Sequence, residues 1–187
     1  MDPDHDDAPS LAETTLRSER LVLEPLTVDH ADALFAGMSD PALYGFIPQE
    51  PPASPDALRL RYTRLAARGS ADGRERWLNW AVRHGDAYVG LVEVTMTSEH
   101  ASLAYFVFTP WQRRGLAREA CAAALAEIWR RDPVPCAVAT VDDRNAASLA
   151  LLASLGFVEE RRVPGADFFK GHPSDEIVLR LARPRDL

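Results

Sequence analysis

"SLAYFVFTPWQRRGLAREAC", residues 102–121, contains the residues that decide the fold. Residues 102–110 carry no charge and are rich in aromatic and β-branched side chains, which predicts a β-strand. An alanine-rich run starts after Gly115 and predicts a helix that ends near Arg131. Gly115 and Ala117 are small, so backbone N–H groups can come close to an anion at the start of this helix. The order strand, small-residue loop, helix therefore predicts an anion-binding loop.

Two common phosphate-binding loops do not match this sequence. A Walker loop needs GxxxxGK[ST], and no lysine is present in the loop. A dinucleotide-binding loop needs GxGxxG, and the loop contains a single glycine. What remains is the pattern Q-x-x-G-x-A from Gln112 to Ala117.

The rest of the chain predicts a mixed α/β sheet. We expect strands at 20–26, 77–84, 87–97, 135–141 and 176–183, and helices at 27–38, 56–69 and 144–157. The strand at 135–141 follows a helical crossover, so it should run parallel to the strand at 102–110. No repeat or second core is evident. We therefore expect a mobile acidic tail over residues 1–14 and a single domain over residues 15–187.

Composition limits the classes of partner. The net charge of −7 argues against a nucleic-acid binder, because affinity for phosphate backbones needs clustered cations. No apolar run has the length of a membrane span, and the acidic N-terminus does not resemble a secretory signal, so we expect a cytoplasmic protein without a membrane partner. The five histidines are scattered and show no metal-ligand spacing, so no metal is expected. Cys121 and Cys136 are expected to be buried, inert thiols.

Several motifs together resemble one family. The Q-x-x-G-x-A loop, "SERLVLEPL" (residues 18–26), Asn145 and Ser148 at the start of a helix, and Leu155-Gly156-Phe157 at its end resemble the GCN5-related N-acetyltransferase (GNAT) superfamily. Within this superfamily, the motifs resemble the RimJ/RimL-like branch of ribosomal-protein N-terminal acetyltransferases. The resemblance covers about residues 19–183 of this chain. The resemblance implies a mostly antiparallel sheet, flanked by helices, that splits into a wedge between two parallel central strands.

The resemblance also implies that the anion is the pyrophosphate of acetyl-CoA, held by backbone N–H groups from Arg113 to Ala117. The pantetheine arm would lie in the wedge. The residues it assigns to cosubstrate binding are Phe106, Val107, Phe108, Gln112, Arg113, Arg114, Gly115, Leu116, Ala117 and Asn145. Simpler roles stay open: the loop as a plain turn, Asn145 as a helix N-cap, and the two phenylalanines as core residues.

The implied reaction is direct acetyl transfer to a primary amine in a ternary complex. Glu93 is the preferred general base, because it interrupts an apolar strand where an ionised carboxylate is costly. A solvated Glu93 stays open as the alternative, with Asp142, Glu159 and Asp167 as other bases. Relatives often use a tyrosine to protonate the leaving thiolate. The helix after Asn145 contains none, so Ser148 or water is expected to take this role.

The acceptor is left open among protein N-termini, amino acids, polyamines and aminoglycoside antibiotics, as is the oligomeric state. We expect the acceptor side to be framed by residues 46–55, the two N-terminal helices and residues 163–172. Two other functions remain: a non-catalytic acyl-CoA-binding or sensing module, and an interaction domain in which the loop is accidental.

Overall fold

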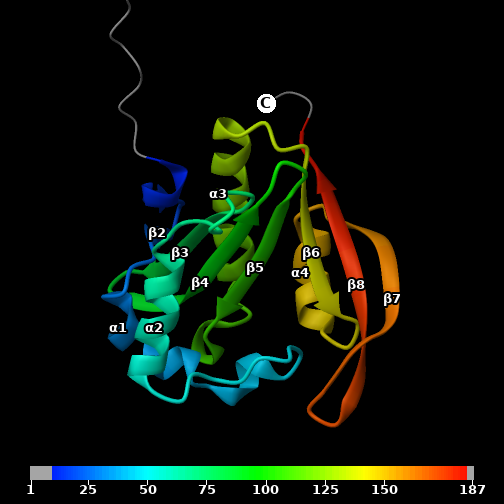
Figure 1. The fold of residues 1–187 in the computed structure, drawn as a ribbon, viewed down its shortest axis with the longest axis horizontal. Helices are drawn as coiled ribbons and strands as arrows, with labels where there is room; N and C mark the ends of the chain where they lie inside the picture. The colour runs from blue at the N-terminus through cyan, green and yellow to red at the C-terminus, as the bar shows by residue number, and fades with distance from the viewer. Residues whose placement is uncertain (1–9, 185–187) are drawn as a thin grey trace, which may run out of the picture.

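A computed structural model describes residues 10–184 and places all of the strands in one sheet (Figure 1). The spatial order of the strands is β1-β2-β3-β4-β5-β6-β8-β7. Their bounds are β1 Leu16–Arg17, β2 Leu21–Pro25, β3 Arg76–His84, β4 Ala87–Met96, β5 Ala101–Val107, β6 Cys136–Asp142, β7 Val158–Phe169 and β8 His172–Ala182.

The sheet is split at its only parallel pair within the described residues. β5 and β6 run parallel, and every other neighbouring pair is antiparallel. They are paired only at Ala101–Ala137 and Ser102–Val138, and then they diverge (Figure 1). This confirms the predicted fold class. It is a mixed, mostly antiparallel sheet that opens into a wedge between two parallel strands.

Helices cover both faces of the sheet. The bounds are α1 His30–Met38, α2 Pro55–Leu65, α3 Leu116–Arg131 and α4 Ala146–Ser154, with short 3-10 helices at Leu11–Glu13, Pro41–Tyr44 and Thr109–Trp111. In Figure 1, α2 crosses in front of the central strands and α3 lies behind them. None of the helices within residues 10–184 is long and apolar enough to cross a membrane.

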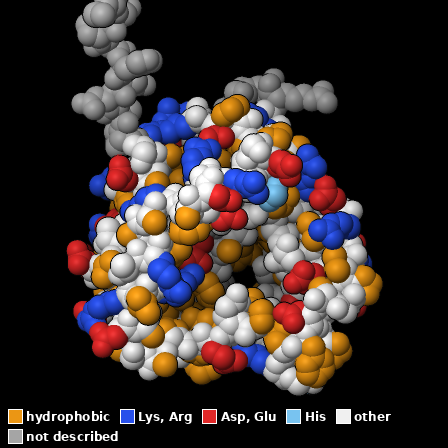
Figure 2. Space-filling model, in the orientation of Figure 1, with side chains coloured by type: hydrophobic (Ala, Val, Ile, Leu, Met, Phe, Trp, Pro, Cys, Tyr) orange, Lys and Arg blue, Asp and Glu red, His pale blue; other side chains and the backbone are white. Residues whose placement is uncertain are grey.

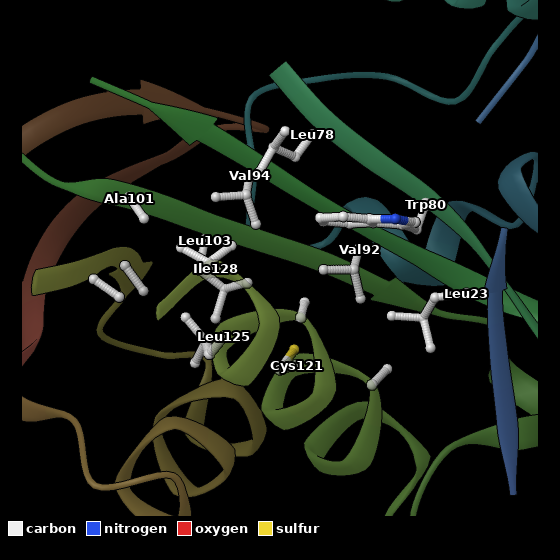
Figure 3. Close-up of a cluster of buried hydrophobic side chains, with 14 of the residues drawn as sticks. Leu23, Leu78, Trp80, Val92, Val94, Ala101, Leu103, Cys121, Leu125 and Ile128 are labelled. Carbon is white, nitrogen blue, oxygen red and sulfur yellow. The ribbon is translucent and has the colours of Figure 1, made fainter. Parts of the chain in front are cut away.

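The larger hydrophobic core lies between the sheet and α3 (Figure 3). Trp80, Val92 and Val94 point from the strands towards Cys121 and Ile128 of the helix. The apolar side of α3 is buried against this core and includes Leu116, Ala120, Ala124, Leu125 and Ile128. Cys121 and Cys136 are both buried free thiols, and burial raises the pKa of Cys121.

A second, smaller core lies on the opposite face, where Leu34 of α1 and Leu58 of α2 pack with Leu91 of β4. Because successive strand residues point to opposite faces, Leu91 and Glu93 face α2 whereas Val92 faces α3. This alternation decides the orientation of Glu93, which the sequence pattern alone could not fix.

Two segments differ from the elements expected from the sequence. β7 is a long strand at the edge of the sheet, where the sequence pattern predicted none. The predicted tail lies mostly outside the described residues, but its last part is described. There Leu11–Glu13 form a 3-10 helix, Ala12 packs in the larger core, and Trp80 Nε1 donates to the Thr14 carbonyl.

Candidate acyl-CoA and acceptor site

The loop before α3 has an unusual backbone. Gly115 has φ of +76° and Arg113 has φ of +60°, so both lie in the left-handed region. Within residues 10–184, the backbone N–H groups of residues 113–117 have no hydrogen-bond acceptor. Such a run of free donors at the start of a helix favours a bound anion.

A network of polar side chains from residues 18–20 and from α3 holds this loop in place. The Arg20 guanidinium donates to the Arg114 carbonyl over 3.1 Å. Glu119, in the first turn of α3, accepts from Ser18 Oγ at 2.7 Å and from the Arg20 backbone N–H at 2.8 Å. Burial would raise the pKa of Glu119, but these hydrogen bonds outweigh it and lower the pKa. The loop is therefore held in place by the turn between β1 and β2, a link that the sequence did not predict.

The loop side chains add positive charge beside the free N–H groups. Arg113 and Arg114 are both exposed, and the Arg114 guanidinium lies 5.0 Å from the centre of the Trp111 ring. Gln112 turns back instead, and its Nε2 donates to the Val107 carbonyl over 2.9 Å. Two exposed guanidinium groups next to unpaired amides suit a ligand with several phosphate oxygens.

Among the strands of residues 10–184, none pairs with the β5 edge that faces β6 from Leu103 onward. An extended ligand can bind such an edge by backbone hydrogen bonds. The Phe108 N–H is not available for this, because it donates to the Val89 carbonyl. The Phe106 ring packs 5.7 Å from that of Tyr44, and both phenylalanines belong to the smaller core. Their side chains thus have the structural role that the sequence left open.

Asn145 and Ser148 sit together at the start of α4. Asn145 Oδ1 accepts from the Ser148 backbone N–H over 3.1 Å, so Asn145 is the helix N-cap. Ser148 Oγ lies 2.6 Å from the hydroxyl of Tyr105, which reaches it from β5. Burial raises the pKa of Tyr105 to about 12, although its hydrogen bond with Ser148 acts in the opposite direction. A protonated tyrosine therefore stands beside Ser148, although the helix itself contains none.

The sequence did carry a signal for this contact. Alternation along β5 places Tyr105 on the same face as Leu103, towards α3 and α4. The absence of a tyrosine from the helix therefore does not mean that none lies beside Ser148.

A cleft of about 380 Å³ lies on the α2 face of the sheet. Figure 2 shows this face hollowed near its centre, between β5 and β6. The residues that line the cleft are Arg61, Leu65, Trp77, Asn79, Glu93, Thr95, Ser102, Leu103, Ala104, Val138, Ala139 and Thr140. It thus spans β3 to β6 and includes the point where β5 and β6 part.

Glu93 lies in this cleft rather than on the open solvent face. Its side chain is 16% exposed, and its Oε1 accepts from Arg61 Nη2 over 2.6 Å. Its cross-strand neighbours are Asn79 on β3 and Ala104 on β5. The carboxylate is therefore placed next to Ala104, two residues beyond the last β5 residue that pairs with β6.

The other three carboxylates do not line the cleft. Hydrogen bonds from Arg144, together with one from Ser174, lower the pKa of Asp142 to about 2 against the effect of burial, which makes it a weak base. Glu159 is exposed and paired with Arg162, and Asp167 is exposed on β7. Within residues 10–184, no group of three or more histidine, cysteine, aspartate or glutamate side chains could hold a metal ion.

A split sheet, a run of free N–H groups at a helix start and a cleft with a carboxylate near the split agree with the arrangement that the resemblance to the GNAT superfamily implies. The family model described as the acetyltransferase (GNAT) domain matches residues 20–158, and the chain belongs to this family of N-acetyltransferases. Acetyl-CoA is the typical cosubstrate of the family. No curated protein sequence matches the chain.

Solved structures show the same fold at low sequence identity. RimJ from Mycobacterium smegmatis, in complex with CoA-disulfide, has a TM-score of 0.80 and 20% identity, covering 91% of this chain and 88% of its own. The ribosomal-protein-S5-alanine acetyltransferase from Vibrio fischeri has a TM-score of 0.77 and 16% identity, with coverage of 92% and 98%. An acetyltransferase from Salmonella typhimurium that modifies the N-terminal serine of ribosomal protein L7/L12 has a TM-score of 0.78 and 17% identity, with coverage of 90% and 99%.

Proposed function

We propose that the chain transfers the acetyl group of acetyl-CoA to a primary amine by direct attack in a ternary complex. The acceptor classes that fit this reaction are a protein N-terminus, an amino acid, a polyamine or an amine-bearing antibiotic. The observation that carries the proposal is the alignment of two sites along β5. The free N–H groups of residues 113–117 lie beyond one end of the unpaired edge, and Glu93 lies beside Ala104 near the other.

In this scheme the loop holds the pyrophosphate and the unpaired edge of β5 holds the pantetheine arm. Apart from Phe108, whose N–H already donates to the Val89 carbonyl, the residues assigned to cosubstrate binding keep those roles as part of the proposal. A backbone N–H on the β5 edge stabilises the developing oxyanion. Preorganised donors of this kind need no rearrangement during the reaction.

The proposed proton transfers use two groups on opposite sides of the wedge. An amine of ordinary pKa must lose a proton before its nitrogen can attack the thioester carbon. Glu93 receives this proton, directly or through water, after its pairing with Arg61 loosens. When the C–S bond breaks, Ser148 donates its hydroxyl proton to the leaving thiolate and takes a proton from Tyr105, which is 2.6 Å away and in turn regains a proton from solvent.

A turnover screen tests the function. Acetyl-CoA is incubated with the protein and with peptides of different first residues, amino acids, polyamines or aminoglycosides, and the products are identified by mass spectrometry. Acetylated amine in at least one class supports the proposal. Tight binding of CoA without any acetylated product would favour a non-catalytic acyl-CoA-binding module, and no CoA binding would favour an interaction domain.

The role of Glu93 gives a sharper test. Glu93→Gln should lower turnover by roughly a hundred-fold at neutral pH, because the amine then has no base. The defect should shrink as the pH rises, since the acceptor then arrives deprotonated, and acetyl-CoA affinity should not change. pH–rate profiles of wild type and variant on one acceptor measure this. An equal loss at every pH would instead assign Glu93 a positioning role.

A further inference from the structure

The cleft contains one cation and one carboxylate, and the two are paired. Arg61 and Glu93 are the only charged residues that line it, and Arg61 Nη2 donates to Glu93 Oε1 over 2.6 Å. Arg61 lies on α2, one turn before Leu65, which lines the cleft as well. The proposed base is thus neutralised by a side chain from the helix that covers this face of the sheet.

This pairing is incompatible with the action of Glu93 as a base. The guanidinium stays charged throughout the pH range in which an amine reacts, so it cannot take part in proton transfer. A cation at hydrogen-bond distance also favours the ionised form of a carboxylate and opposes its protonation. Loss of Arg61 alone is costly, because it leaves a carboxylate side chain that is 16% exposed without a counter-charge. Another cation must therefore replace the guanidinium.

The contacts of the pair allow such an exchange. Within residues 10–184, the bond to Glu93 is the only one that the Arg61 side chain donates, and this side chain is 36% exposed. Glu93 Oε2 has no partner among these residues, and it is not one of the four buried polar atoms that lack one, so it is accessible. An incoming ammonium group can bind Oε2 first, and its charge then repels the guanidinium towards solvent.

We propose that Arg61 is a positioning residue that competes with the acceptor amine for Glu93 and restores the ionised carboxylate after each turnover. This inference rests on the proposed function and adds the step that frees the base. The acceptor arrives as an ammonium ion and displaces Arg61 from Glu93.

The protons balance in this sequence. One N–H bond of the ammonium breaks, its proton passes to the Glu93 carboxylate, and its electron pair stays on the nitrogen, which attacks the thioester carbon. The nitrogen loses a second proton to water as the amide forms, which balances the proton that the leaving thiolate takes up. When the acetylated product has left, the returning guanidinium of Arg61 favours release of the first proton from Glu93 to water.

Two phenols are the other titratable groups beside the pair. Tyr44, at the end of the 3-10 helix before residue 45, and Tyr62 of α2 lie close enough to interact electrostatically with both members of the pair. Burial raises the pKa of each phenol, so both stay uncharged while an amine reacts. The strand neighbours of Glu93 are an asparagine and an alanine, which do not titrate. The Arg61–Glu93 pair is therefore expected to control the low-pH limb of the rate.

The test removes the guanidinium from the cleft and then supplies it from solution. Arg61→Met keeps an unbranched side chain without the charge. Arg59→Met is the control, because Arg59 lies on the same helix but pairs with Asp32 and Asp56 outside the cleft. The KM and kcat/KM of the amine that the turnover screen acetylates fastest are measured from about pH 5 to about pH 10. Methylguanidinium chloride is the competing probe.

Arg61→Met should lower the KM of the acceptor about five-fold, because no cation has to be displaced. The low-pH limb of kcat/KM should move up by about one pH unit or more, since no positive charge favours the ionised carboxylate. Methylguanidinium should compete with the acceptor in this variant and raise its KM towards the wild-type value, and wild type should need about five-fold more of it for the same inhibition. Arg59→Met should match wild type within about two-fold.

Three results would each overturn the inference alone, provided that Glu93→Gln is impaired as expected. They are an unchanged or higher KM in a folded Arg61→Met protein, a low-pH limb that does not move, and equal inhibition of variant and wild type by methylguanidinium. Should Arg61→Met not fold, Arg61→Gln is measured in the same way and must meet the same requirements. If wild type acetylates no amine, or if Glu93→Gln keeps full turnover, the proposed function or its base fails and the inference fails with it.

Discussion

At the scale of single residues, Gly115 links the loop's backbone to its proposed ligand. Its φ of +76° lies in the left-handed region, which β-branched residues rarely adopt. A Cβ at this position would first meet Arg20 Nη2, at 3.5 Å, which is ordinary contact. A larger side chain there would therefore act through the backbone and not through a clash.

We expect Gly115→Val to weaken CoA binding by about ten-fold or more, because the loop must leave the left-handed region and lose the alignment of its N–H groups. Calorimetry with CoA measures this. Gly73→Val is a matched control, since Gly73 has φ of +70° and no atom within 4 Å of a Cβ. Both variants should lose similar stability, and only Gly115→Val should lose affinity. Near-normal affinity in a folded Gly115→Val protein would contradict the anion cradle.

The pair Ser148 and Tyr105 belongs to the same scale. Ser148→Ala should lower kcat by about ten- to a hundred-fold, because the leaving thiolate loses its proton donor. The dissociation constant of acetyl-CoA should stay the same. Tyr105→Phe should give a smaller loss of the same kind, since Ser148 remains but is no longer oriented. Presteady-state kinetics and calorimetry separate the two effects, and unchanged kcat in both variants would assign the proton to water.

At the scale of secondary structure, alternation along strands determined which predictions succeeded. The central strands carry apolar residues on both faces, so their positions were predictable from local sequence. β7 was missed because its residues are almost all exposed and its pairing with β8 shifts register around Arg161 and around Pro164 and Gly165. An edge strand of this kind has neither a buried stripe nor a regular period.

An ionic cluster ties the end of β6 to β8 and to the start of α4. The Asp142 carboxylate accepts from Arg144 and from Ser174 Oγ, the latter over 2.7 Å. These bonds lower the pKa of Asp142 from its usual 3.8 to about 2. A lowered folded-state pKa means that the cluster stabilises the fold above pH 3.8 and that this contribution is lost as the pH falls through about 2.

We therefore expect Asp142→Asn to reduce the free energy of unfolding by roughly 2 kcal/mol at pH 7, the amount that corresponds to this pKa change. The difference from wild type should shrink between pH 4 and pH 2. Urea unfolding followed by circular dichroism at several pH values measures it. A difference that does not depend on pH would show that the carboxylate's charge is not what stabilises this junction.

At the scale of the whole molecule, the resemblance of a few motifs to the GNAT superfamily predicted the split sheet. Local sequence patterns did not predict it. The wedge is a property of two strands that meet only at Ala101 and Ser102, and no single segment encodes it. Several features of the site bring together residues that are far apart in the chain. They are the Arg20–Glu119 ion pair, the Tyr105–Ser148 contact and the cleft that Asn79 lines. Such contacts follow from the tertiary fold, so sequence periodicity does not reveal them.

At the far end of the wedge from this pairing, the turn between β7 and β8 contacts the segment that follows the 3-10 helix at Pro41–Tyr44 (Figure 1). Lys170, in the turn between β7 and β8, donates through Nζ to the carbonyls of Ile47 and Gln49, each over 3.1 Å, and to that of Tyr44. Glu50 lies 3.7 Å from the same nitrogen. This turn and the segment after the 3-10 helix at Pro41–Tyr44 were both predicted to frame the acceptor, and Lys170 joins them.

We expect Lys170→Met to raise the KM for the acceptor by about ten-fold, because several charge-assisted hydrogen bonds to these carbonyls are lost together. Acetyl-CoA affinity should stay within about two-fold, since the loop of residues 113–117 is not part of this bridge. Amides of residues 44–50 should exchange hydrogen faster, because the segment loses its tie to the turn. Steady-state kinetics and exchange mass spectrometry measure these changes.

Glu50→Gln is the control, since it removes only an exposed ion pair of small energy and should change neither the KM nor the exchange rate. Unchanged exchange in Lys170→Met would mean that residues 44–50 hold their position without the bridge. Faster exchange with an unchanged KM would mean that the acceptor enters the cleft without contacting them.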